Sequence, residues 1–124
     1  MTFYPDLSRY EYMAREISAS VLNVGWLGIE SPYHTGAIDE ESLQRLVRHY
    51  ENRVNRTRGF HYCPFCIEAK FGLAVNLGDR EIILGGAEIR VSDEQGVTYA
   101  APDLIYHYIT DHQYKPPDEF LRAL

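Results

Sequence analysis

Two cysteines close together, and two histidines much later in the chain, constrain this sequence more than any other feature. Cys63 and Cys66 are the only cysteines, and they enclose a proline and a phenylalanine in a C-x-x-C turn. His107 and His112 follow far downstream. Thiolates and imidazoles are the donors that zinc prefers, and a structural zinc site holds four of them at tetrahedral corners. The pattern therefore predicts one structural Zn²⁺ with the ligands Cys63, Cys66, His107 and His112.

The histidine spacing restricts the structure that can carry these ligands. An ideal helix would turn two residues five positions apart about 140° away from each other, at roughly 100° per residue. We therefore expect His112 to leave the regular helix at its last turn, an ending that Asp111, Gln113 and the later prolines favour. Segment 67–106 is much longer than the roughly 12–15 residues inside a compact zinc finger, so strands must return the chain. His61 is an alternative ligand that could replace one of the histidines.

Two classes of enzyme share part of the cysteine pattern. The redox dithiol of glutaredoxin-like proteins follows a strand and precedes a helix that lowers the cysteine pKa, but segment 55–59 is not typical of a strand and Gly72 limits the following helix. A zinc deaminase requires H-x-E and P-C-x-x-C, whereas the proline here lies inside the cysteine pair. The sequence favours a non-enzymatic role, and a thiol–disulfide or zinc-dependent activity centred on Cys63-Pro64-Phe65-Cys66 is the alternative.

Length and hydropathy predict a single domain spanning residues 1–124. This length allows a modest hydrophobic core without additional staples. No run approaches the roughly 18 apolar residues of a membrane span, and the first residues lack the basic and apolar regions of a signal peptide. We therefore expect a cytoplasmic protein, a compartment in which thiols stay reduced and available to a metal.

The charge of the chain bears on its partners. The formal net charge is −6, with 18 acidic and 12 basic side chains, and this argues against nucleic-acid binding. A local basic cluster of Arg53, Arg56 and Arg58 remains an alternative nucleic-acid contact. The acidic balance and the ten tyrosines instead predict a module that binds a basic protein partner through an acidic, tyrosine-rich face, for example as an immunity or antitoxin-type protein.

The periodicity of the chain predicts an α+β fold. Asp39 resembles an N-cap, and apolar residues recur at helical spacing through Val54, so we expect a helix over 39–55. A second helix is expected over 102–111, with Pro102 in its first turn, and a last short helix after Pro116-Pro117. Strands are predicted at 21–27, 73–77, 81–84, 87–91 and 97–100. The expected fold is a small, mostly antiparallel sheet with two main helices, pinned by a zinc-knuckle-type site.

Several longer motifs carry a family resemblance. They are Asn23-Val24-Gly25-Trp26-Leu27, segment 58–66 around the cysteines, Ala87-Glu88-Ile89-Arg90-Val91 and the stretch from Tyr99 through His107 and His112 to Phe120. Together they resemble a family of small bacterial proteins that is a domain of unknown function, with members of about this length. The resemblance implies no activity. It implies only a pattern in which these cysteines and histidines stand together.

Overall fold

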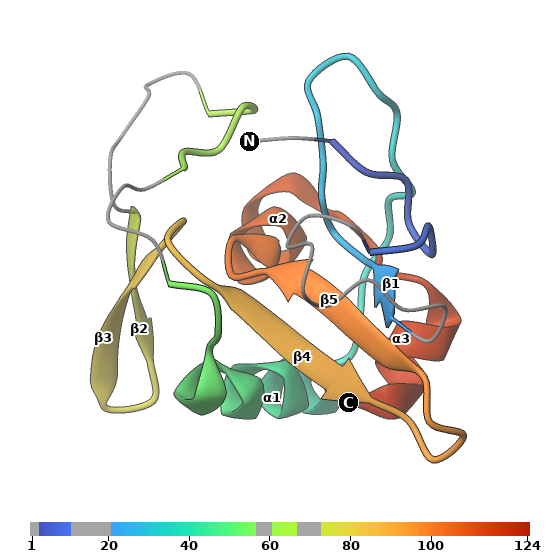
Figure 1. Cartoon of the computed structure of the whole chain (residues 1–124). Coiled ribbons are helices and arrows are strands. Elements are labelled where there is room, and N and C mark those ends of the chain that lie inside the picture. Colours follow the sequence, from blue (N-terminus) through green and yellow to red (C-terminus); the bar gives the residue numbers. More distant parts are fainter. Residues whose placement is uncertain (1–2, 11–20, 57–60, 67–72) are drawn as a thin grey trace.

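The computed structural model describes residues 3–10, 21–56, 61–66 and 73–124, which form an α+β arrangement (Figure 1). The strands of this part are β1 (Val21–Asn23), β2 (Leu73–Leu77), β3 (Arg80–Leu84), β4 (Glu88–Ser92) and β5 (Thr98–Pro102). Its α-helices are α1 (Glu40–Arg48), α2 (Ile105–His112) and α3 (Asp118–Ala123). A 3-10 helix at His49–Asn52 follows α1. The expected α+β class is confirmed, as is the short helix after the paired prolines.

The strands form two sheets rather than one mostly antiparallel sheet. In the larger sheet β5 lies between β1 and β4, parallel to β1 and antiparallel to β4. β2 and β3, at the two strands predicted over 73–77 and 81–84, form a separate antiparallel hairpin. The turn at Gly78-Asp79 fixes this hairpin locally, whereas no local signal selects β5 as the partner of β1. The mixed sheet could therefore not be derived from the pattern of the strands alone.

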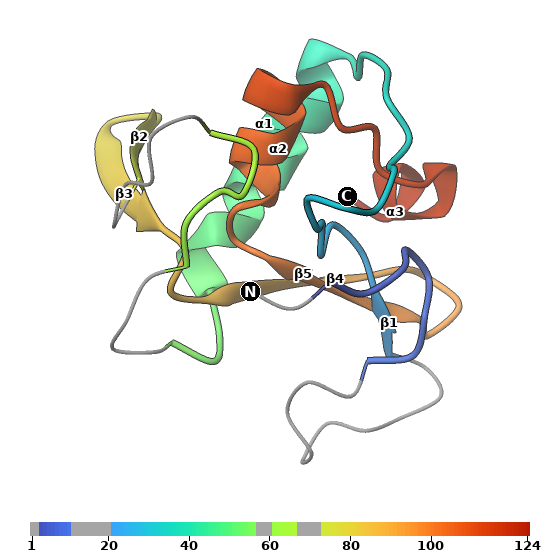
Figure 2. The same cartoon turned by 90° about the horizontal axis from the view of Figure 1, so that it is seen from above.

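Helices α1, α2 and α3 lie on one side of the three-stranded sheet, with α1 and α2 next to each other (Figure 2). Alternate strand residues point to one face of a sheet, and here the helix-facing residues form the main hydrophobic core. From the strands this core receives Ile89, Val91, Tyr99 and Ala101, and from the helices Leu46, Ile105, Tyr108 and Phe120. Full burial of a valine, leucine, isoleucine or phenylalanine side chain stabilises the fold by roughly 1.5–3 kcal/mol.

The predicted first helix begins where expected and ends early. Asp39 is its N-cap, and its carboxylate accepts a hydrogen bond from the Ser42 N–H at 2.7 Å. After Arg48 the helix tightens into the 3-10 turn. Val54 then forms an antiparallel bridge with Glu88 through two backbone hydrogen bonds. The prediction that Val54 belongs to the helical face was wrong. β4 is an edge strand, and its free backbone groups pair with the backbone of Val54.

Two other predicted boundaries were also wrong. The first strand stops at Asn23, because Gly25 adopts a positive φ of 82° and its N–H donates to the Asp6 carboxylate. Pro102 is the last residue of β5, a strand end at which its missing N–H is tolerated. The second helix therefore begins only at Ile105. Within the described residues, no helix is long and apolar enough to cross a membrane.

Candidate metal centre

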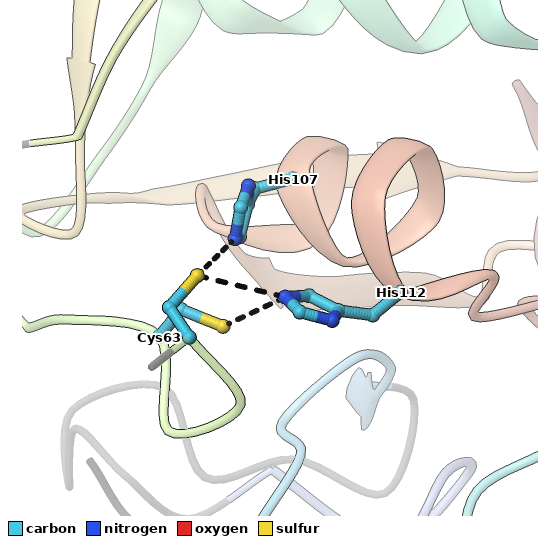
Figure 3. Close-up of side chains that lie close together, drawn as sticks. Cys63, His107 and His112 are labelled. Atoms are coloured by element: carbon cyan, nitrogen blue, oxygen red, sulfur yellow. Dashed lines mark hydrogen bonds between the residues drawn. The ribbon is translucent and has the colours of Figure 1, made fainter. Parts of the chain in front are cut away.

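The structure brings together one ligand atom from each of the four residues that the sequence predicted. The sulfur atoms of Cys63 and Cys66 and one ring nitrogen each of His107 and His112 all lie within 4.8 Å of one another. The Cys63 sulfur is 3.3 Å from His112 Nε2, and the Cys66 sulfur is 3.3 Å from His107 Nε2 and 3.7 Å from His112 Nε2. Figure 3 shows both rings extending from α2 toward the cysteine turn.

Three of the six separations between the donor atoms match the edges of a zinc tetrahedron, and the others lie within 4.8 Å. With zinc–sulfur bonds of about 2.3 Å and zinc–nitrogen bonds of about 2.0–2.1 Å, neighbouring donors are about 3.3–3.8 Å apart. The sulfur–nitrogen distances of 3.3–3.7 Å fall in this interval. Two thiols and two imidazoles also form a donor set typical of structural zinc. The four residues therefore fit a bound metal ion in both geometry and chemistry.

The cysteines lie in a tight turn whose backbone faces one of the sulfurs. The Phe65 N–H points at the Cys63 sulfur at 3.4 Å, a contact that stabilises a thiolate. The Phe65 ring packs against the His112 ring at 5.4 Å and edge-on against Tyr108 at 5.9 Å between centroids. The phenylalanine between the cysteines thus holds the turn against the helix that carries the histidines.

The histidines occupy the middle and the end of α2. His107 is buried, whereas His112 is the last residue of the helix and half-buried. Gln113 then adopts a left-handed conformation with φ of 53°. The expectation that His112 leaves the regular helix was wrong, because His112 is still helical and the chain leaves the helix at Gln113. The two rings meet edge to face with their centroids 5.0 Å apart.

A carboxylate supports the buried histidine from behind. His107 presents Nε2 to the sulfurs, and its Nδ1 lies 3.6 Å from an Asp111 carboxylate oxygen. The other oxygen of Asp111 accepts a hydrogen bond from the Thr110 hydroxyl at 2.8 Å. A carboxylate behind a ligating histidine fixes its tautomer and raises its basicity. Sequence reasoning assigned Asp111 only to the end of the helix and did not find this role, although its position four residues after His107 was the available signal.

Burial sets the ionisation of the donors. It raises the pKa of the Cys63 thiol to about 11, against the hydrogen bond from the Phe65 N–H that lowers it. Burial also lowers the pKa of His107, while the charge of Asp111 raises it. Both groups are consequently neutral at pH 7 without a cation. His107 is then ready to ligate, and Cys63 must lose a proton to do so.

A buried polar network connects the two halves of the site. Asp103, directly before α2, accepts a hydrogen bond from the Gly85 N–H at 2.7 Å and one from the Arg53 guanidinium at 3.1 Å. The Gly85 carbonyl in turn accepts from the His61 N–H at 2.8 Å, at the start of the cysteine turn. The helix predicted over 102–111 would have placed Asp103 in its first turn, whereas α2 begins only at Ile105.

Other candidate residues have different roles from those predicted. His61 lies outside the four-residue group and is held through its backbone. Arg53 is paired with Asp103, and Arg58 lies outside the described residues. The expected tyrosine-rich contact face was wrong in large part, because five tyrosines are buried and bonded or packed inside the fold: Tyr10, Tyr50, Tyr99, Tyr108 and Tyr114.

The fold and the site together define a small α+β protein with a two-cysteine, two-histidine group able to hold a metal ion. The chain belongs to the family described as Domain of unknown function (DUF7919), which matches residues 2–124. No curated protein and no solved structure matches it.

Proposed function

We propose that the protein binds one structural zinc ion through Cys63, Cys66, His107 and His112. The observation that carries this proposal is the mutual approach of four soft and borderline donors to within 4.8 Å of one another. The cysteine turn and α2 are far apart in the sequence, so the ion would cross-link two remote segments. Binding of this kind contributes directly to the free energy of folding.

A structural role is better supported than a catalytic one. Four protein ligands complete the tetrahedron, whereas catalytic zinc keeps one position for water or substrate. The thiol–disulfide alternative requires a thiolate of low pKa at neutral pH. Burial raises the Cys63 pKa to about 11 instead, so this thiol is a poor nucleophile. Together these features favour a non-enzymatic, metal-stabilised domain spanning residues 1–124.

The biological role that we propose is that of a cytoplasmic protein-binding module. The net charge of −6 supports a basic protein partner, because opposite charges accelerate encounter and disfavour wrong partners. One concrete form is an immunity or antitoxin-type protein that neutralises a basic toxin. Co-purification from the native host at stoichiometric ratio is the expected result, and the absence of any stoichiometric partner would contradict the module.

Native mass spectrometry combined with a thiol count tests the metal proposal. We expect one zinc per chain, and both thiols should resist alkylation until a strong chelator is added. A metal-free protein with two freely reactive thiols would refute the structural zinc and favour the dithiol alternative. The same measurement on a Cys66→Ser variant should show the zinc lost, which ties the metal to this site.

A further inference from the structure

The two cysteines of the metal centre lie close enough to react with each other. Their sulfur atoms belong to the group of ligand atoms that all lie within 4.8 Å of one another, and both side chains are free thiols. A C-x-x-C pair has the spacing that disulfide oxidoreductases open and close. The chain contains only these two cysteines. Oxidation can therefore form one intramolecular disulfide, between Cys63 and Cys66.

The two thiols differ in their access to solvent. Cys63 is only 5% exposed and belongs to the main hydrophobic core, whereas Cys66 is half-buried and packs at the margin of this core. The susceptibility of a cysteine to peroxide follows its exposure and its thiolate character. Zinc binding requires both sulfurs as thiolates, so exposure decides between them. An oxidant from solvent therefore reaches Cys66 first, and the Cys63 sulfur lies beside it, within 4.8 Å.

Both sulfurs are needed to complete the donor set with the histidines. The Cys66 sulfur is 3.3 Å from His107 Nε2 and 3.7 Å from His112 Nε2, and the Cys63 sulfur is 3.3 Å from His112 Nε2 (Figure 3). The thiolate form of cysteine is the metal ligand, and a disulfide sulfur carries no negative charge. After oxidation the two histidines would supply only two of the four donors of a structural zinc site.

We propose that the metal centre is a redox-sensitive site, from which a hydroperoxide releases the zinc ion by converting Cys63 and Cys66 into a disulfide. A dithiol reductant restores both thiols, and the site then binds zinc again. This inference rests on the proposed zinc binding, and it adds a regulation of the same four residues.

The oxidation takes place in two steps. The Cys66 thiolate attacks the O–O bond of the hydroperoxide and gains a hydroxyl group as a sulfenic acid, while the other oxygen takes up a proton and leaves as an alcohol or water. The Cys63 thiolate then attacks the Cys66 sulfur. The S–S bond forms, the S–O bond breaks, and the hydroxide leaves with a proton as water. The two sulfurs together lose two electrons, which the peroxide takes up.

Contacts away from the donor atoms hold both halves of the site after the ion leaves. At the start of the cysteine turn, the His61 N–H donates to the Gly85 carbonyl at 2.8 Å. In the other half, Ile105 and Tyr108 of α2 belong to the main core. We therefore expect the structural change on oxidation to be confined to residues 61–66 and 105–113, so that zinc can bind again without refolding of the sheet.

Treatment of the zinc-loaded protein with hydrogen peroxide tests the inference. We expect release of one zinc per chain to a chromophoric chelator and, in parallel, an intact mass of the metal-free chain that is lower by two hydrogen atoms. Dithiothreitol and added zinc should restore the original zinc content. Zinc that stays bound in excess peroxide, or zinc release that accompanies a sulfinic acid instead of a disulfide, would overturn the inference. The zinc content before oxidation tests the proposed metal binding separately, so the two proposals can fail independently.

Two substitutions that keep four zinc donors distinguish the roles of the cysteines. In Cys63→His the half-buried Cys66 remains, and peroxide should convert it to a sulfenic acid that dimedone traps. In Cys66→His the buried Cys63 remains, and it should react roughly tenfold more slowly because it is less exposed. Equal rates of trapping in the two zinc-loaded variants would refute Cys66 as the attacking sulfur. If a variant does not bind zinc, the mass and zinc release of the wild type still decide the inference.

Discussion

Asp111 joins the buried histidine of the metal centre to the surface. Its carboxylate lies 3.6 Å behind the His107 ring and is fixed on its other side by Thr110. Because it is more than half exposed, its replacement should not disturb the core. The interaction therefore offers a way to change the properties of the site without unfolding the protein.

We expect Asp111→Asn to weaken zinc binding about 10–100-fold, because the neutral amide polarises and orients the His107 ring less well than the carboxylate. Competition with a chromophoric chelator measures this change. Asp79→Asn, at an exposed hairpin position, should leave the affinity unaltered. An equal affinity for the wild type and Asp111→Asn would show that Asp111 does not support the ligand.

Removing a proposed ligand should destabilise the protein more than replacing Asp111, which lies behind His107. Cys63→Ser and His107→Ala each remove one donor from the tetrahedron, so both should lower the melting temperature of the zinc-loaded protein markedly. Differential scanning calorimetry checks this expectation with and without chelator. If neither variant changes the melting temperature, zinc has no structural role.

At the scale of elements, the position of the cysteine turn depends on the corner between β3 and β4. Gly85 has a positive φ of 106°, and a Cβ built on it would lie 2.1 Å from the His61 carbonyl oxygen. The backbone of the cysteine segment thus passes directly over this glycine. Through Asp103 the same corner is tied to the start of α2, so it sets the distance between the two halves of the metal site.

Gly85→Ala should destabilise the protein by about 2–4 kcal/mol, because it adds both backbone strain and a collision with His61. It should also weaken zinc binding by displacing the cysteine turn. Gly78→Ala is the control, since its φ is 69° but no atom lies within 4 Å of the added Cβ. Urea unfolding of both variants separates collision from strain. If Gly85→Ala and Gly78→Ala lose the same free energy of unfolding, the backbone at His61 moves away from the added methyl group without a free-energy cost.

The metal ligands could be predicted from the sequence because their residue types and local spacing are themselves the chemical signal. The supporting residues could not. Asp103 resembles an ordinary first-turn acid, but α2 begins only at Ile105, and the Asp103 carboxylate faces inward to Gly85 and Arg53. Similarly, the helix after Asp39 was predicted correctly at its start, where a cap is local. Its end was wrong, because Val54 is captured by β4.

For the whole molecule, binding of the ion is linked to protons. The Cys63 thiol has a pKa raised to about 11 by burial and is protonated at pH 7, whereas burial keeps His107 neutral. Zinc binding must then release the thiol proton, so affinity should rise with pH and fall on acidification. The change is up to about tenfold per pH unit for each proton released.

Isothermal titration calorimetry at pH 7, in buffers with different ionisation enthalpies, counts the protons. We expect a release of at least one proton per zinc, and progressive loss of zinc as the pH falls toward about 5, where protons compete for the histidines as well. A binding enthalpy that is independent of the buffer would contradict the linkage, because it would mean that no thiol proton leaves.

The parallel pairing of β1 with β5 has a consequence for synthesis in the cell. Residues 21–23 cannot find their partner strand until residues 98–102 have been made, and at about 5–20 residues per second this delay is roughly 4–15 s. During that time the apolar segment around β1, including Val24 and Trp26, which are buried in the finished fold, remains open to chaperones. Folding of this domain therefore cannot be completed before β5 has emerged from the ribosome.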